Sequence, residues 1–142
     1  MSDAQSGKAI SILSIVTSAG LLLFWIGFFT IGLAPADPPA CYFAYEHSFP
    51  LPDIILAMGL LTGGIFNLKG RAPGAPLLVA GGGALVFLGL LDICFNLQNG
   101  MYSISALDMI LNAFINLWCV FFGAAIVLKM KYTSNCFFTS LS

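Results

Sequence analysis

The chain has 142 residues, of which 59% are hydrophobic and 8% are charged. A typical soluble domain carries about 25% charged residues, so the composition excludes an ordinary water-soluble domain. The formal net charge is -1 and the bases form no cluster, which gives no footprint for nucleic acid and no polybasic patch for anionic lipid. The lipid bilayer is the expected partner of this chain, and nucleic acid is not.

The first long uncharged segment runs from Ala9 to Ala36 and is rich in Leu, Ile and Phe. A hydrocarbon core of about 30 Å needs about 20 apolar residues in a helix, so the segment is long enough to cross a membrane. Its start resembles a secretory signal, because Lys8 precedes an apolar run and a small-x-small sequence begins at Ala34. The apolar run is longer than a usual signal core, so we expect a retained span over residues 9–34.

The second span is expected at residues 49–68, although only fifteen uncharged residues separate Asp53 from Lys69. At 1.5 Å per residue these fifteen reach roughly 22 Å, so the helix must begin before Asp53. Pro50 and Pro52 favour a helix start at this position. Asp53 is therefore predicted to lie in the first turn, where the helix dipole favours a negative charge.

Two more spans are expected at residues 76–96 and 105–128. Short turns join the last three spans, whereas the outer link, residues 35–48, is long, Pro-rich and aromatic and is predicted to lie at the membrane interface. Residues 129–142 are expected to form a weakly ordered cytoplasmic tail. The predicted fold class is an all-α integral membrane protein, with a single domain over residues 1–142 in which four transmembrane helices form an up-down bundle.

The charged residues sort between the two ends of this bundle. All five bases fall at the end that holds both termini and the second connection; they are Lys8, Lys69, Arg71, Lys129 and Lys131. The positive-inside rule therefore predicts a protein of the cell membrane, plasma or inner, with both termini in the cytoplasm. The opposite end carries carboxylates and no base.

Three spans are predicted to present a polar side chain at one level near the outer end. Counted from the cytoplasmic end of their helices, Asp53, Asp92 and Asn112 lie sixteen, sixteen and seventeen residues along, which is roughly 24 to 26 Å. Asn96 follows Asp92 by one turn, and Asp108 precedes Asn112 by one turn. We call these five residues the outer cluster.

Asp92 has the least favourable position, because it lies near the C-terminal end of its helix, where the dipole opposes a negative charge. Three things could stabilise it: protonation, hydrogen bonds from Asn96, Asn112, Tyr102 or a neighbouring helix, or a bound cation. The outer cluster is therefore open to three interpretations. Its side chains are hydrated by lipid headgroups, or they form a structural polar network, or they form a cation or proton site.

Small residues and outer side chains add further expectations. Gly59 and Gly63 form a small-xxx-small pair in the second span, and with Gly82 in the third span they predict close packing between these two helices. Cys41 and Cys94 lie on the outer side, where they either pair or pack as small apolar residues.

Glu46 and His47, in the outer link, are candidate outer ligands whose alternative is a solvated loop. His47 is the single histidine of the chain, and there is no CxxC pair. No cofactor is predicted, because a haem held by two histidines and a thiol redox pair both lack their residues. An enzyme at the outer interface that uses Glu46, His47 and Asp53 stays open.

Two functions of different class fit these observations. The favoured function is a non-catalytic subunit or an accessory or lipid-binding membrane protein, acting as a homo-oligomer or within a larger membrane complex. The alternative is a small cation- or proton-linked transporter or channel that uses the outer cluster. These two hypotheses differ in whether the carboxylates of Asp53 and Asp92 face one enclosed cavity or the lipid headgroups.

Overall fold

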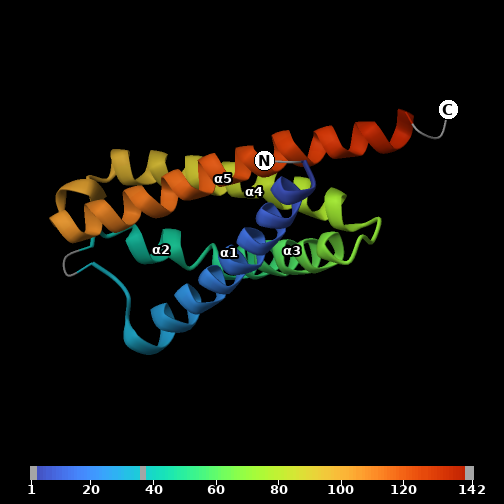
Figure 1. Cartoon of the computed structure of the whole chain (residues 1–142). Coiled ribbons are helices and arrows are strands. Elements are labelled where there is room, and N and C mark those ends of the chain that lie inside the picture. Colours follow the sequence, from blue (N-terminus) through green and yellow to red (C-terminus); the bar gives the residue numbers. More distant parts are fainter. Residues whose placement is uncertain (1–2, 36–37, 140–142) are drawn as a thin grey trace.

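A computed structural model describes the backbone of residues 3–35 and 38–139 and the side chains of residues 5–35 and 38–130. Within these limits every regular element is a helix (Figure 1). In chain order they are α1 (Asp3–Ile31), α2 (Tyr42–Glu46), α3 (Pro50–Leu68), α4 (Gly74–Gln98), the short 3-10 helix η1 (Met101–Ser103) and α5 (Ala106–Thr139). Among the described residues, four helices are long and apolar enough to cross a membrane, namely α1, α3, α4 and α5.

The helices differ from the expected spans at several points; α1, for example, begins at Asp3 and α4 covers Gly74–Gln98. Helix α1 stops at Ile31, before the expected end at residue 34, because Gly32 takes a positive φ of 75° that a helix cannot continue. The outer link contains α2, which was not predicted. Helix α5 continues to Thr139 instead of ending at residue 128. The expected weakly ordered tail is therefore helical as far as it is described, and the side chain of Lys131 lies outside the described residues.

Local signals in the sequence explain where α3 and α5 begin. Pro50 opens α3, where a missing N–H costs little, and Asp53 falls in the first turn. The Ser105 hydroxyl accepts a hydrogen bond from the Asp108 backbone N–H (3.1 Å) and donates one to the Asp108 carboxylate (2.6 Å). These bonds satisfy groups at the start of α5. Asp108 is thus a helix-start residue.

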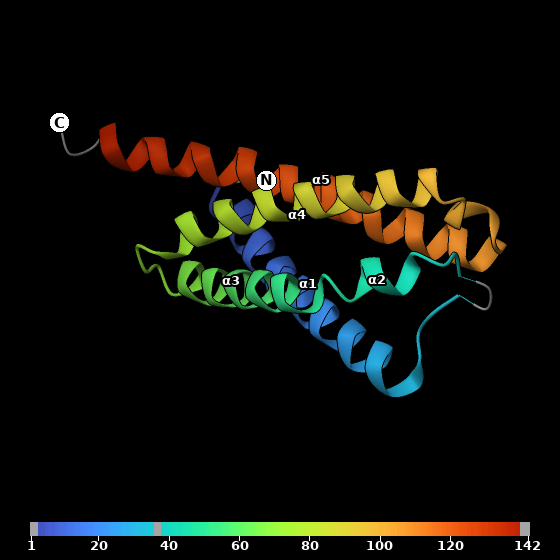
Figure 2. The ribbon, with the colours of Figure 1, turned by 180° about the vertical axis from the view of Figure 1, so that it is seen from behind.

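Each of the four long helices packs mainly on the long helix next to it in the chain. Helix α1 packs mainly on α3, α3 on α4 and α4 on α5, whereas α1 and α5 meet over a short stretch. Figures 1 and 2 show why: α1 crosses the other three obliquely, and its C-terminal half diverges from α5. The Trp118 indole of α5 donates a hydrogen bond to the Thr17 hydroxyl of α1 (3.1 Å), near the point where the two helices separate.

The bundle end away from α2 is tightly packed. Four aliphatic side chains there have no exposed surface: Leu60, Leu78, Leu85 and Ile126. Polar bonds between helices accompany them, because the Asn67 amide donates to the Ser11 hydroxyl (2.8 Å) and Ser18 donates to the carbonyl of Ala57 (2.7 Å). Buried aliphatic side chains and hydrogen bonds between helices therefore hold this half of the bundle together.

Glycines let the helices approach, but not in the pattern expected. A Cβ on Gly63 would lie 3.0 Å from the Leu77 Cβ of α4, which is a close contact between α3 and α4. A Cβ on Gly82 would lie 2.8 Å from the carbonyl of Gly123, so this glycine faces α5 and not α3. The expectation for Gly59 is wrong, because nothing lies within 4 Å of its Cβ position. Each face of α4 therefore meets a different neighbour.

These contacts predict opposite outcomes for two matched substitutions in α3. Gly63→Leu would push a side chain into the α4 backbone, so we expect it to destabilise the protein by about 1 to 3 kcal/mol. Gly59→Leu adds the same side chain to open space and should leave stability close to that of the parent. Thermal unfolding in detergent micelles measures both; equal melting of the two variants would contradict close packing at Gly63.

Candidate functional site

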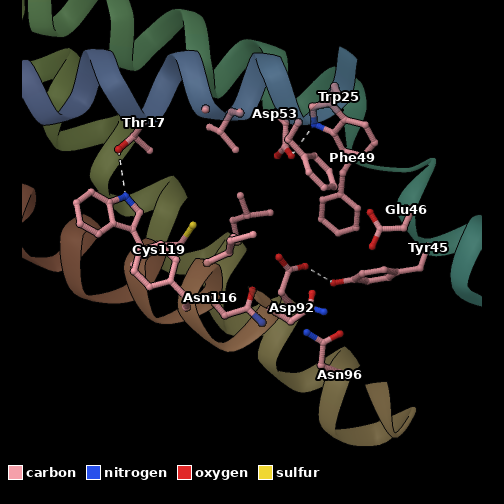
Figure 3. Close-up of a pocket in the computed structure, with 18 of the residues that line it drawn as sticks. Thr17, Trp25, Tyr45, Glu46, Phe49, Asp53, Asp92, Asn96, Asn116 and Cys119 are labelled. Atoms are coloured by element: carbon pink, nitrogen blue, oxygen red, sulfur yellow. Dashed lines mark hydrogen bonds between the residues drawn. The ribbon is translucent and has the colours of Figure 1, made fainter. Parts of the chain in front are cut away.

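A cavity of about 520 Å³ lies between the diverging halves of α1 and α5 (Figure 3). Helices α3 and α4 and the segment from α2 to α3 close its inner side. It is lined by Val16, Thr17, Gly20, Leu21, Phe24 and Trp25; by Tyr45, Glu46, Phe49 and Asp53; by Leu88, Asp92 and Asn96; and by Asn112, Phe114, Ile115, Asn116, Trp118 and Cys119. Every helix except η1 contributes to this wall.

Two carboxylates of the outer cluster face this cavity, and each is held by a neutral donor. The Trp25 indole of α1 donates a hydrogen bond to Asp53 Oδ2 (3.0 Å), and Asp53 is only 6% exposed. The Tyr45 hydroxyl donates to Asp92 Oδ1 (2.8 Å), and Asp92 is half-buried. Figure 3 shows both carboxylates turned towards the cavity. Asp92 therefore takes its donor from Tyr45, and not from Asn96, Asn112 or Tyr102.

The asparagines of α4 and α5 complete the polar wall. Asn96, Asn112 and Asn116 all line the cavity. The Asn112 amide donates to the carbonyl of Asp108 (2.8 Å) and the Asn116 amide donates to the Tyr102 hydroxyl (3.0 Å). Asp108 itself is absent from the cavity wall. The structure thus brings four of the five outer-cluster residues to one cavity and leaves Asp108 at the start of α5.

The two candidate outer ligands, Glu46 at the end of α2 and His47 directly after it, point in different directions. Glu46 lines the cavity, and Figure 3 shows its carboxylate turned inward near Asp92. His47 is exposed, with its Nδ1 2.6 Å from the carbonyl of Phe43 and its ring among those of Phe28 and Phe29. Consecutive residues of a helix point about 100° apart, so one can face the bundle while the next faces outward. A joint site of Glu46 and His47 does not form.

Burial changes the acid–base behaviour of α2. Burial, and then the negative charges of Asp92 and Asp53, raise the pKa of Glu46 to about 7 from its ordinary value of 4.5. Burial and Asp92 also raise the pKa of Tyr45 well above its usual range. Tyr45 therefore remains a protonated donor to Asp92 at any physiological pH. Its ring is also fixed by stacking on Phe95, with 3.7 Å between ring centroids.

The rim of the cavity is apolar and exposed. Val16 and Gly20 of α1 and Phe114 and Ile115 of α5 line it while remaining exposed at the surface of the bundle. Nothing lies within 4 Å of the Cβ position of Gly20, so this point of the rim is open. The cavity therefore opens sideways between α1 and α5, with its polar residues at depth.

The acidic side chains that face the cavity do not converge on one point. In the described part of the chain, no group of three or more His, Cys, Asp or Glu side chains is arranged to hold one metal ion.

Cys41 and Cys94 are both exposed and free, and the Cys41 thiol donates to the Asn99 side-chain oxygen (3.3 Å). The outer pair of cysteines therefore forms no cross-link beside the cavity.

Several residues of this site were missed in the sequence. No motif or spacing in the sequence singles out Trp25, Tyr45, Gly20 or Phe49 as residues of a site. The Pro-rich and aromatic composition of the outer link was the available hint, because a short helix rich in aromatics can fold back onto a bundle. Residues 25 and 53, or 45 and 92, are too far apart in the chain for spacing to pair them.

Glu46→Gln should remove a pH-dependent loss of stability. The folded-state pKa of Glu46, about 7, exceeds the ordinary value of 4.5, so the folded protein holds this proton more tightly than the unfolded chain. The contribution of Glu46 to the free energy of unfolding therefore falls as the pH rises from about 4.5 to about 7. We expect the variant to melt like the parent below this range and a few degrees higher above it, by thermal unfolding in micelles; the same difference at both ends would contradict the burial of Glu46.

Compared with known proteins, the chain matches no protein-family model, no curated protein and no solved structure.

Proposed function

We propose that this chain is a non-catalytic membrane protein that binds a small amphiphile, a lipid-like molecule, in the cavity between α1 and α5. The observation that carries the proposal is the division of this cavity into a polar inner end and an apolar, exposed rim. A polar headgroup finds hydrogen-bonding partners at the inner end, and an alkyl or ring system finds apolar surface at the rim. The volume of about 520 Å³ lies within the range of about 300 to 1,000 Å³ that small-molecule sites occupy.

The direction of the opening supports a ligand that comes from the bilayer. Val16, Phe114 and Ile115 are exposed on the sides of helices that are apolar enough to cross a membrane. Lipid chains would surround these side chains, so an amphiphile could enter between α1 and α5 without passing through water. Its headgroup would then exchange lipid headgroup contacts for Glu46, Asp53 and Asp92.

We further propose that the protein lies in the cell membrane with both termini in the cytoplasm. The described bases, Lys8, Lys69, Arg71 and Lys129, are all exposed. The Asn67–Ser11 hydrogen bond joins α1 to α3 close to Lys8 and Lys69, at the bundle end opposite α2. The positive-inside rule turns that end to the cytoplasm, and the cavity would then face the outer leaflet.

A cation- or proton-linked transporter is the second candidate. It is favoured by the two carboxylates within membrane-crossing helices that face one cavity, a typical feature of ion and proton pathways. The bundle half beyond the cavity is filled by Leu60, Leu78 and Leu85, each fully buried, which favours a binding site closed at one end. Cation flux into liposomes that is lost in Asp92→Asn would favour transport instead.

The two tryptophans provide a direct test of amphiphile binding. They are the only two in the chain, and both line the cavity. We expect a neutral dodecyl ether of a nitroxide, added to the protein in maltoside micelles, to quench their fluorescence with a saturable dependence on concentration. Gly20→Leu fills an open point of the rim, so its apparent Kd for this probe should rise about tenfold, which corresponds to the 1.4 kcal/mol of a moderate steric penalty.

Gly83→Leu is the matched control for this test. Gly83 is also a mid-helix glycine with nothing within 4 Å of its Cβ position, and it does not line the cavity. It should bind the probe like the parent. Quenching that rises without saturation, equally in all three proteins, would indicate partition into the micelle and would refute the binding site.

The orientation is tested by a reporter at the C-terminus. Alkaline phosphatase fused after Ser142 should be inactive in intact cells, because the enzyme folds only outside the cytoplasm, whereas a fluorescent protein at the same position should fluoresce. The opposite pattern would reverse the proposed topology and would turn the cavity to the cytoplasmic leaflet.

A further inference from the structure

The inner end of the cavity gathers negative charge without a compensating base. Glu46, Asp53 and Asp92 line it, and none of the 19 lining residues is a Lys, Arg or His. The donors to Asp53 and Asp92 are Trp25 and Tyr45, which are neutral, and each donates to one carboxylate oxygen. The Glu46 carboxylate accepts no hydrogen bond from the described residues. A ligand that carried a negative charge would be repelled here, whereas a positive charge would be attracted.

An independent observation at the same end is the side chain of Asn96. It is only 6% exposed and it lines the cavity, yet no described residue hydrogen-bonds to its amide. Buried amides in native proteins nearly always have a partner. None of the buried side-chain N and O atoms in the described residues lacks a partner, so the unpaired amide of Asn96 must be accessible from the cavity. Figure 3 shows it turned towards Asp92 and the cavity, where a bound molecule can hydrogen-bond to it.

Aromatic rings surround the same end. Trp25, Tyr45 and Phe49 line the cavity beside the carboxylates, and the rings of Tyr45 and Phe49 are 4.7 Å apart. Aromatic faces attract cations, and substituted ammonium ions are recognised by such rings together with carboxylates. A bare metal ion needs ligands that converge on one point, and the described carboxylates do not form such a group.

We propose that the headgroup recognised by this cavity is a substituted ammonium ion, held by Glu46, Asp53 and Asp92 with the Asn96 amide and the aromatic rings around it. This inference deepens the proposed function and depends on it, because it specifies the chemical class of the amphiphile. The ligand is an organic cation with an apolar body: the ammonium lies at depth, and the apolar body leaves through the rim between α1 and α5.

The experiment compares two quenching probes that differ only in charge. One carries a dodecyl chain joined to a nitroxide ring through a quaternary ammonium, and the other is the dodecyl ether used above. At a pH above about 8 the Glu46 carboxylate, with its pKa of about 7, is ionised. We expect the parent to bind the cationic probe at least about tenfold more tightly than the neutral one, as expected for one or more charge-assisted contacts.

Glu46→Gln and Asp92→Asn test the carboxylates with little change in shape. Glu46 accepts no hydrogen bond from the described residues, and an Asn at position 92 can still accept the bond from Tyr45. Each variant should weaken the cationic probe about tenfold and the neutral probe by clearly less, so that the preference of the parent for the cationic probe is lost. Asp108→Asn removes the same charge at the same end of the bundle but outside the cavity, and it should bind both probes like the parent.

The possible results separate this inference from the proposed function. If both probes bind saturably with equal affinity, and Glu46→Gln changes neither, the ammonium inference is overturned while amphiphile binding stands. If neither probe binds saturably, both proposals fail. If Asp108→Asn weakens the cationic probe as much as Glu46→Gln, the preference reflects the general charge of that end, and the ammonium site is overturned.

A competition experiment identifies the source of the ammonium. Displacement of the cationic probe by dodecyltrimethylammonium and by dodecylphosphocholine alike would support the site and indicate a zwitterionic phospholipid. Displacement by dodecyltrimethylammonium alone would support the site and indicate a hydrophobic amine without a phosphate. Displacement by neither compound would overturn the inference.

Discussion

Two hydrogen bonds from neutral donors organise the end of the bundle that holds the cavity: Trp25 to Asp53 and Tyr45 to Asp92. A carboxylate inside an apolar bundle is costly unless it is paired or hydrogen-bonded. A lysine or arginine at either position would have neutralised the charge and filled the space. The indole and the phenol stabilise the carboxylates without neutralising them, so the cavity keeps both its negative charge and its volume.

These two bonds also determine which elements must meet. The first brings α1 to the start of α3, and the second brings α2 down onto α4. Because α1 packs obliquely on α3, its C-terminal half diverges from α5, and the lateral opening is a consequence of that tilt. The other half of the bundle closes around Leu60, Leu78, Leu85 and Ile126. The protein therefore has a tightly packed core at one end and, at the other end, a cavity with a polar inner end and an apolar rim.

The arithmetic of helix rise anticipated much of the site. Counting residues from the end that carries the bases predicted Asp53, Asp92 and Asn112 at one level, because depth along a straight helix depends only on residue number, and all three line the cavity. The same counting placed Asp108 one turn further out, and it does lie in the first turn of α5, but it does not line the cavity, because depth says nothing about which way a side chain points. Asp108 is held by Ser105 at the helix start. The small-residue pattern failed in the same way at Gly59, which faces open space.

The sequence by itself determined the class of protein, the four apolar helices and the segregation of bases from carboxylates, because hydropathy, span length and charge are properties of local composition. Only the tertiary structure decided that Trp25 and Tyr45 are the donors, that Glu46 faces inward while His47 faces outward, and that α1 and α5 separate. These features depend on the crossing angle of helices and on contacts between residues 28 and 47 positions apart in the chain. No local pattern encodes such distances, because they result from the packing of the whole bundle.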